Sequence, residues 1–535
     1  MRNLQTSILF FLLFFTINVL LISGCVIQNK QNEFYHSTDN QSDRMIKITN
    51  ETYCADLGDG FYLNPILKGD WGDPTVLRDG SDYYMTTHTA TLSTPSMLIW
   101  HSKDLINWDP ISYALHQDLG GAVWAADFVK HNDMFYMYLP VPSKGTNYVI
   151  SAPHPSGPWS NPVDLKVSGI DPGHIATPEG KRYLHLDDGY IVELSNDGLS
   201  VKTEKTKVYE GWNYPNDWIV ECFCLESPKL ILRDEWYYLT VAQGGTAGPP
   251  TGHMVVSARS RTPYGPWENS PYNPVVKTKT RNEKWASMGH GTLISTPYDE
   301  WYIVFHAFEK GARHMGRQIL MLPIEWTEDG WFRIPKAVDP AKPIKKPKGG
   351  VAVENKMKLS DNFSSNTLGL QWKMFGAAIG ERVSVQNNVL VIQGQGVNPA
   401  ESNPVVIDPM DNYYQVEVGL SVDKRTRCGL IFYSNQKKYL GLELDESGVY
   451  RLSGFGYSRE KIFEAKKIDN VRFRLSNDHN DLLYWYSLDG GMNWERIDFV
   501  NNLTDWAGGS SIRPGIYSTG RGKAYFSDFK YQSIK

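Results

Sequence analysis

Cysteine is scarce in this sequence, with 5 residues among 535. Cys54, Cys222, Cys224 and Cys428 are too few and too far apart to form the disulfide framework of a small secreted domain. The spacing Cys222-x-Cys224 is not the usual spacing of a zinc site, and no further ligands lie near it in the sequence. We therefore expect these four cysteines to be buried small hydrophobic residues or incidental thiols.

A broad excess of positive charge is also absent. The net charge is -5 and the pI is near 6.2, which argues against nucleic acid as a partner. The chain has no Gly-x-Ser-x-Gly elbow, no His-Glu-x-x-His motif and no phosphate-binding glycine loop, so common serine, zinc and nucleotide sites find no support. No long amphipathic run with helix caps occurs between residues 61 and 335, which disfavours an α/β barrel.

Aromatic residues are abundant, at 13% of the chain with 17 Trp and 30 Tyr. Such a composition suits β-sheets, and it suits carbohydrate binding, in which flat rings meet sugar faces. Short aromatic strands return about every fifty residues, which is the period of a propeller blade of four strands. The five repeats predict an all-β fold that begins with a five-bladed β-propeller over residues 56–335. The repeated strands are residues 82–85, 134–138, 181–185, 235–239 and 300–304.

Two further segments follow the predicted propeller. Residues 336–358 are rich in Pro, Lys and Gly, which is typical of a solvated linker. Residues 359–535 contain strands that alternate apolar and polar side chains, the pattern of sheets with one buried face. This second domain is predicted to be a β-sandwich of the jelly-roll, concanavalin-like kind.

The N-terminal residues are predicted to target the protein rather than to join the fold. Residues 1–24 have a positive start and a long apolar run that ends in small residues before Cys25. Residues 20–25 resemble a bacterial lipobox, in which Cys25 becomes the lipidated first residue. We expect an exported bacterial lipoprotein, anchored in the membrane on the periplasmic side or at the cell surface, with residues 25–55 as a flexible tether. The alternative is an ordinary secretory peptide with a chance cysteine.

Three carboxylates open apolar strands in the predicted propeller: Asp73, Asp127 and Glu226. Since the innermost strand of each blade lines one central channel, carboxylates at equivalent blade positions converge there. Taken alone, Asp73 is equally a turn-forming Asp beside a proline. Glu226 has a local rival in Glu221, and Asp171, which also precedes a proline, is a lesser candidate in the third blade.

The motifs of the propeller region resemble those of glycoside hydrolase family 43, which includes β-xylosidases and α-L-arabinofuranosidases. The resemblance favours Glu226 over Glu221, because Ser-Pro-Lys-Leu follows it as in that family, where Gly more often holds the Ser227 position. Residues 359–363 with 371–372 are similar to the start of the concanavalin-like domain of many family members. The matching propeller motifs are residues 73–74, 124–127, 226–229, 289–293, 316–318 and 323–331.

This resemblance implies a mechanism with three carboxylates. Asp73 is expected to be the general base, Glu226 the general acid, and Asp127 the residue that orients the acid and adjusts its pKa. Cleavage with inversion needs the base and the acid about 6.5 to 9.5 Å apart. A third negative group near the acid disfavours its ionised form, so that its proton is retained. The implied activity is exo-acting release of xylose or arabinose from xylan, arabinan or pectin fragments of plant cell walls.

Three more residues are implied to bind substrate: Arg317, Trp124 and His290. Arg317 resembles the family's sugar-binding arginine, whose planar fork holds two hydroxyls. His290 resembles the histidine at the channel floor, which lies near a cation or water in some relatives. We expect no required cofactor, with a structural calcium at His290 as the alternative. Trp285 either stacks on sugar or packs between blades.

Several alternatives remain open from the sequence. The same channel also suits galactosidase or fructosidase action, and a protein of this shape without catalysis would be a glycan-binding lipoprotein. The sandwich either closes one side of the active-site mouth or acts as a carbohydrate-binding module. The sequence does not indicate an oligomeric state.

Overall fold

The computed structural model describes residues 48–535, except 89–92, 352–356, 377–378, 455–457, 465–469, 501, 504–505 and 507–509. The predicted signal peptide, Cys25 and most of the predicted tether lie outside the described residues. Residues Lys47–Lys535 form one compact unit. Among the described residues, no helix combines the length and the apolar character that crossing a membrane requires.

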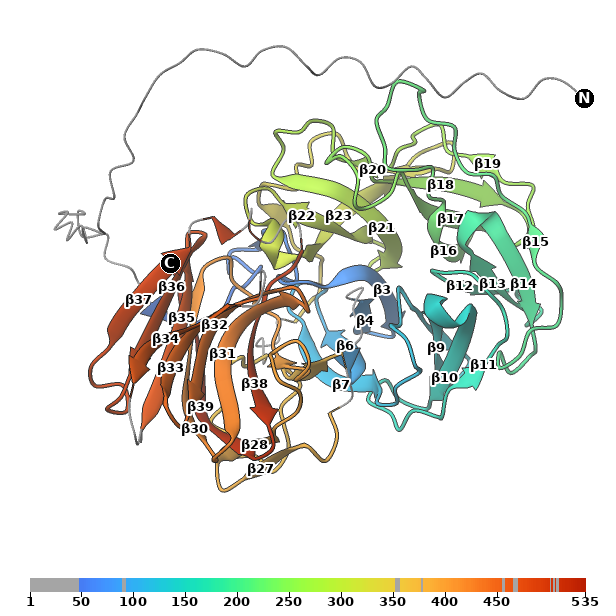
Figure 1. The fold of residues 1–535 in the computed structure, drawn as a ribbon. Helices are drawn as coiled ribbons and strands as arrows, with labels where there is room; N and C mark the ends of the chain where they lie inside the picture. Colours follow the sequence, from blue (N-terminus) through green and yellow to red (C-terminus); the bar gives the residue numbers. More distant parts are fainter. Residues whose placement is uncertain are drawn as a thin grey trace, which may run out of the picture. The chain divides into compact units, whose positions relative to one another are not determined.

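Five antiparallel sheets follow one another along the chain and form a five-bladed propeller (Figure 1). This confirms the predicted all-β fold. Each predicted aromatic strand is the second strand of its blade, with side chains buried on both faces of the sheet. The blades are β3 (Gly72–Asp79), β4 (Asp82–His88), β6 (Ser96–Ser102) and β7 (Asp109–Leu115); β8 (Asp127–His131), β9 (Met134–Val141), β10 (Thr146–Ala152) and β11 (Val163–Asp164); β12 (Gly173–Ala176), β13 (Arg182–Leu186), β14 (Tyr190–Leu194) and β15 (Thr206–Lys207); β16 (Glu226–Arg233), β17 (Trp236–Gln243), β18 (Met254–Ser260) and β19 (Glu268–Asn269), with β20 (Val276–Lys277) on β18; and β21 (Trp285–Ser295), β22 (Trp301–Glu309), β23 (Arg317–Trp326) and β24 (Phe332–Arg333).

Aromatic and aliphatic side chains fill the space between neighbouring blades. Between the first two blades, Ile99 and Met137 are fully buried with Phe128, and Tyr84 meets Phe135 edge to face at 6.1 Å. Burial of this kind stabilises by about 1.5 to 3 kcal/mol for each large side chain. The aromatic repeats therefore serve mainly as packing between blades. The described part of the propeller region also contains short 3₁₀ turns: η1 (Pro142–Lys144), η2 (Asp187–Gly189) and η3 (Arg313–Met315).

The predicted linker is ordered against the propeller in part. Within residues 336–358, β25 (Ile344–Lys345) pairs with β2 (Phe61–Tyr62). The ammonium of Lys346 lies 2.7 Å from the carboxylate of Asp56. The expectation of a solvated linker is therefore wrong for this stretch, because its backbone groups and charge have partners on the propeller.

Two eight-stranded antiparallel sheets form the C-terminal β-sandwich. Inward-facing residues such as Val416 and Val418 of one sheet and Leu430 and Phe432 of the other share one apolar core. The first sheet contains β27 (Val383–Gln386), β28 (Val389–Gln393), β39 (Lys523–Ile534), β30 (Tyr414–Val422), β35 (Val471–Asp478), β36 (Asp481–Ser487), β37 (Glu495–Val500) and, on β39, β1 (Ile48–Thr49); the second contains β34 (Ser458–Glu464), β33 (Gly448–Ser453), β32 (Lys438–Asp445), β31 (Thr426–Asn435), β38 (Arg513–Gly520), β29 (Val405–Val406), β26 (Lys373–Phe375) and β5 (Ser93–Thr94).

Two strands of the sandwich come from outside the predicted sandwich segment. β1 lies within the predicted tether, yet Ile48 and Thr49 pair with Ile534 and Ser533. β5 lies within the propeller segment of the sequence and pairs with β26 through Thr94 and Met374. The last part of the predicted tether is thus a strand, because the edge of the sandwich offers it hydrogen-bond partners.

The cysteines depart from expectation at one place. Cys222 and Cys224 form a disulfide, with Cα atoms 5.2 Å apart, within the range that a disulfide spans. The prediction of free thiols is therefore wrong for this pair, since the turn around the intervening residue brings the two side chains together. Cys428 is buried, as expected, whereas Cys54 is exposed.

Candidate active site

An unusual backbone geometry occurs within or just before the innermost strands of four blades. Asp73, Asp171, Ser227 and His290 all have positive φ, between 51° and 55°. Non-glycine residues rarely adopt this conformation, and it is concentrated at functional sites. The pairing register shifts at the same places in β3, β16 and β21. Because such bulges re-aim side chains, they turn these residues toward one another.

Asp73 lies at the centre of a dense set of contacts. Nδ1 of His88 donates to its Oδ2 at 2.7 Å, and Nη1 of Arg317 donates to its Oδ1 at 2.6 Å. The backbone N–H of Asp73 donates to Nδ1 of His306 at 3.2 Å. The residue is buried, and its carboxylate is fixed from several directions.

These contacts determine the charge of Asp73. Burial alone would raise the pKa of its carboxyl, but Arg317, His290 and the hydrogen bond from His88 hold that pKa well below its usual range. Burial lowers the pKa of His306 to about 3, so this ring is neutral and able to accept the N–H of Asp73. Asp73 is therefore ionised at neutral pH, as a general base must be.

Gly72 makes room for the arginine. A Cβ atom at this position would lie 2.3 Å from the guanidinium carbon of Arg317. Any larger residue would displace Arg317 from Asp73. Residue 72 must therefore be glycine, because the Arg317 side chain passes so close to it.

Glu226 is joined to Asp73 through His290. Nε2 of His290 donates to Oε1 of Glu226 at 3.2 Å, and Nδ1 of the same ring lies 3.3 Å from Oδ1 of Asp73. Burial lowers the pKa of His290, but the carboxylates of Asp73, Glu226 and Asp171 more than offset this and raise it to about 9. His290 is a cation at neutral pH, and both its nitrogens then carry protons.

The structure places Asp171, and not Asp127, in this group. Oδ2 of Asp171 lies 3.7 Å from Nε2 of His290. Burial raises the pKa of Asp171 to about 8; His290 opposes that rise, while the negative charges of Glu226 and Asp73 add to it. The carboxyl of Asp171 therefore keeps its proton to a higher pH than an ordinary aspartate does.

Asp127 has other partners. Its Oδ1 accepts from the ammonium of Lys229 at 2.8 Å, and its Oδ2 accepts from the backbone N–H of His174 at 2.7 Å. Lys229 also donates to the carbonyl oxygen of Pro172 at 2.9 Å. Among the contacts of the described residues, none joins Asp127 to Glu226. Its geometry is that of a buried ion pair that ties three blades together, and it does not fit the predicted role of orienting the acid.

The remaining predicted residues are placed as follows. Trp124 is 38% exposed and lies three positions before Asp127, so its ring is available to a ligand. Trp285 is 1% exposed, and its Nε1 donates to the carbonyl oxygen of Pro340 at 3.2 Å, which favours packing. Glu221, the rival of Glu226, is exposed and accepts the backbone N–H of Ala247 at 2.7 Å. Glu221 thus holds a loop, and Glu226 faces the other carboxylates.

A metal ion was the alternative role for His290. The ligand atoms of Glu226, His253 and His290 lie within 4.8 Å of one another. Calcium takes six to eight oxygen ligands, whereas this set offers two imidazoles and one carboxylate. The residues do not fit calcium, and the charge of His290 already neutralises the carboxylates.

Sequence reasoning missed His88 and His306, and ranked Asp171 below Asp127. The two histidines lie near the ends of second strands, where nothing in the local sequence marks them. Asp171 had a signal: Asp171-Pro172 repeats the pair Asp73-Pro74 at the start of an innermost strand.

Comparisons with known proteins identify the family of the chain. Residues 62–332 match glycosyl hydrolases family 43. A xylan 1,3-beta-xylosidase of Vibrio sp. is 29% identical over 334 residues, covering 53% of this chain and 59% of the relative. A non-reducing end alpha-L-arabinofuranosidase of Bacteroides ovatus is 29% identical over 333 residues, covering 58% and 60%. A beta-xylosidase of Bacillus subtilis is 24% identical over 522 residues, covering 85% and 94%.

The match thus spans little more than half the length of the first two of these relatives. Among solved structures, a family 43 protein of Bacillus licheniformis aligns with a TM-score of 0.80 and 26% identity, covering 88% of this chain and all of that one. A xylan beta-1,4-xylosidase of Bacillus halodurans shares the fold, with a TM-score of 0.77 and 23% identity, covering 88% and 100%. Because the family model matches half of its length, the chain belongs to glycosyl hydrolases family 43.

Proposed function

We propose that this protein is an exo-acting glycoside hydrolase that releases xylose or arabinose with inversion. The observation that carries the proposal is the position of His290 between Asp73 and Glu226. Two such contacts on either side of one imidazole keep the nearest carboxylate oxygens no more than about 9 Å apart, which is compatible with an inverting pair.

The base in this proposal is Asp73. It accepts a proton from a water molecule while the water oxygen bonds to the anomeric carbon. Its fixed negative charge suits this role, because hydrogen bonds from His88 and Arg317 hold the carboxylate in one orientation. A base that is already ionised and oriented needs no reorganisation during the reaction.

The acid in this proposal is Glu226, the most accessible of the site carboxyls, with 19% of its side chain exposed. As the glycosidic bond breaks, the leaving oxygen takes the proton of Glu226. Asp171, next to it, replaces Asp127 as the proposed tuning residue. Two close carboxyls bind protons as a pair, since both cannot easily be ionised together.

The sugar specificity is supported by the relatives rather than by the pocket. The relatives from Vibrio and Bacillus subtilis are named as xylosidases, and the relative from Bacteroides ovatus is named as an arabinofuranosidase. Arg317 and Trp124 are proposed to bind the sugar, the first through hydroxyls and the second by stacking. Plant xylan, arabinan or pectin fragments are the proposed source of substrate.

A panel of chromogenic glycosides tests this function, beginning with β-xyloside and α-L-arabinofuranoside. We expect Asp73→Asn and Glu226→Gln to lower kcat by at least about 100-fold in folded protein. A dinitrophenyl glycoside, whose leaving group needs little protonation, should partly restore Glu226→Gln but not Asp73→Asn. Glu221→Gln is the matched control and should stay within a few-fold of wild type.

Other outcomes of the panel have definite meanings. Turnover of galactosides or fructosides alone would replace the proposed specificity. No turnover of any glycoside or oligosaccharide, with glycan binding retained, would make the protein a glycan-binding lipoprotein.

We also propose that Cys25 anchors the protein to a membrane through lipid. The support is the small-residue motif before Cys25 and the apolar run that precedes it. Cys25→Ala should move the protein from the membrane fraction to the soluble fraction. Unchanged membrane retention would contradict the anchor.

A further inference from the structure

Arg513 belongs to the sandwich, and it contacts Asp70, a propeller residue near the proposed base. It begins β38 and is 1% exposed. Its Nη2 donates to Oδ2 of Asp70 at 2.6 Å, across 443 positions of sequence. Asp70 lies two residues before β3, the strand that carries Asp73. The C-terminal domain therefore touches the segment that leads into the proposed base.

Asp70 also contacts Arg317. Its second oxygen, Oδ1, accepts the backbone N–H of Arg317 at 3.1 Å. The N–H of Trp71 donates in turn to the carbonyl oxygen of Arg317 at 2.8 Å. The backbone of Arg317 is thus held on both sides, and its side chain reaches Asp73 at 2.6 Å. Arg513 and Asp73 are the ends of a short chain of alternating charges.

Other residues of the sandwich fix the side chain of Arg513. Its Nε donates to Oδ1 of Asp408 at 2.7 Å, and Asp408 is also paired with the ammonium of Lys373. Lys373 begins β26, and Asp408 follows β29; both strands lie in the same sheet as β38. Because these partners are almost fully buried, the guanidinium cannot turn away to solvent.

The charges explain why Arg513 is needed. Burial would raise the pKa of Asp70, but Arg513 first, and then Arg317, hold it below its usual range. Without Arg513, Asp70 would be a buried carboxylate whose interaction with Arg317 matters more than before. Arg317 would then be shared between Asp70 and Asp73, since a buried charge takes the partner that is available.

We propose that Arg513 is a positioning residue of the active site, which holds Arg317 against Asp73 by engaging Asp70. The inference rests on the proposed function, because it assigns the sandwich a part in the work of the base. In this role the sandwich supplies a cation that keeps Arg317, in the propeller, paired with Asp73.

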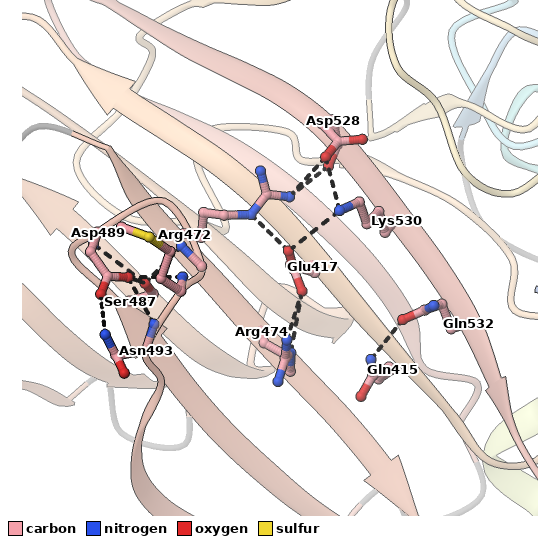
Figure 2. Close-up of polar contacts among 12 residues, drawn as sticks. Gln415, Glu417, Arg472, Arg474, Ser487, Asp489, Asn493, Asp528, Lys530 and Gln532 are labelled. Atoms are coloured by element: carbon pink, nitrogen blue, oxygen red, sulfur yellow. Dashed lines mark hydrogen bonds and ion pairs between the residues drawn. The ribbon is translucent and has the colours of Figure 1, made fainter. Parts of the chain in front are cut away.

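The test compares Arg513→Met with a matched control, Arg472→Met. Arg472 is an arginine of the same domain that also has two carboxylate partners: it is 13% exposed and donates to Glu417 at 2.7 Å and to Asp528 at 3.2 Å. Figure 2 shows Glu417 between Arg472, Arg474 and Lys530 on the outer face of the sheet. Within the described part of the chain, no hydrogen bond or ion pair links this group to Asp73. Both variants lose an arginine with two carboxylate partners.

We expect both variants to lose stability, Arg513→Met more so because its partners are more buried, and only Arg513→Met to lose activity in folded protein. Well below both melting temperatures, Arg513→Met should lower kcat/KM by about 100-fold, since a small displacement of a positioned group costs that much. The acid limb of its kcat/KM profile should move to higher pH, because Asp73 has lost part of its cationic support. Arg472→Met should keep the wild-type rate and profile.

A double variant shows whether Asp70 is the link. In the Asp70→Asn background, Arg513→Met should add little, because residues that act through one contact are not additive. A crystal structure of Arg513→Met gives a readout without activity: the contact of Arg317 with Asp73 should be lost or lengthened beyond 3.5 Å. If wild type shows no turnover, the proposed function fails, and this structural readout still decides the inference.

Three results with Arg513→Met would overturn the proposal. They are an unchanged acid limb in Arg513→Met, an Arg317–Asp73 contact that survives in its crystal structure, or full additivity with Asp70→Asn. An equal loss of rate in Arg472→Met would also overturn it, since the effect would then be a general loss of stability.

Discussion

Nε2 of His290 donates to Oε1 of Glu226 at 3.2 Å, so the proposed acid is held by a ring that also faces the proposed base. Raised by three carboxylates, the pKa of His290 is about 9. A cation at this position offsets the negative charge of the carboxyl groups around it.

His290→Gln should therefore impair catalysis strongly. A glutamine is neutral and cannot face both carboxylates, so we expect kcat to fall by about 100-fold or more. Steady-state kinetics on the most active chromogenic glycoside measure this. His154 is an exposed histidine of the second blade, so His154→Gln is the control and should leave kcat unchanged. A fall in the control as large as in His290→Gln would remove the assignment.

Comparing Asp171→Asn with Asp127→Asn should show which residue affects the proton of the acid and which one stabilises the fold. Asp171→Asn should lower kcat/KM and move the alkaline limb of its profile to lower pH, because the acid loses a neighbour that opposes release of its proton. Asp127→Asn breaks a buried ion pair with Lys229 and should cost stability, on the order of 3 kcal/mol, with a wild-type profile in the folded fraction. Melting curves and pH–rate profiles of both variants decide. The reverse pattern would restore Asp127 to the role that the sequence suggested.

Stability should fall as the pH rises above neutrality. In the folded state, the pKa of His290 is raised from 6.5 to about 9, so its contribution is complete below pH 6.5 and is lost toward pH 9. Asp171, raised to about 8, acts in the same direction from about pH 4 to pH 8. Each proton contributes at most about 1.4 kcal/mol per pH unit. Urea denaturation between pH 6 and 9 measures the slope, and His290→Gln should flatten it above pH 8. A stability that is flat across this range in wild type would contradict the charge assignment.

Ser227→Gly should be tolerated and mildly stabilising. Ser227 has a φ of 55°, a conformation that costs a non-glycine residue about 1 kcal/mol. Glycine adopts it freely, so the melting temperature should rise slightly while kcat is kept. Ser227→Ala is the matched control, because it removes the hydroxyl but retains the strain. An equal gain in both variants would show that the hydroxyl, and not φ, is unfavourable.

The fold was largely predictable because its signals are local. Each blade repeats an aromatic second strand, and packing between blades demands that repeat wherever it occurs. That Asp73 and Glu226 lie near each other was predictable for the same reason, since each stands at the start of an apolar strand, beside a proline or before Ser-Pro. Local sequence carries both signals.

The rest of the site depends on contacts between residues far apart in sequence, which form only when the five blades come together in the propeller. Lys229 lies three residues after Glu226 but reaches Asp127, 102 positions earlier, and nothing local to either residue indicates that pair. His306 and Asp73 are 233 positions apart, and Arg513 and Asp70 are 443 apart. The sequence therefore pointed to Asp127 as a carboxylate at the start of a strand, but it did not show that Lys229 would be its partner.

β5 brings a further consequence. Because Thr94 of the propeller segment pairs with Met374, the second sheet of the sandwich takes one edge strand from the other domain. A hybrid protein that exchanged sandwiches at the connecting segment would leave the edge of β26 without its partner, and an unpaired edge strand invites association with other chains. The unit that can be exchanged between family members is therefore not the C-terminal domain alone, but that domain together with residues 93–94 of the first blade.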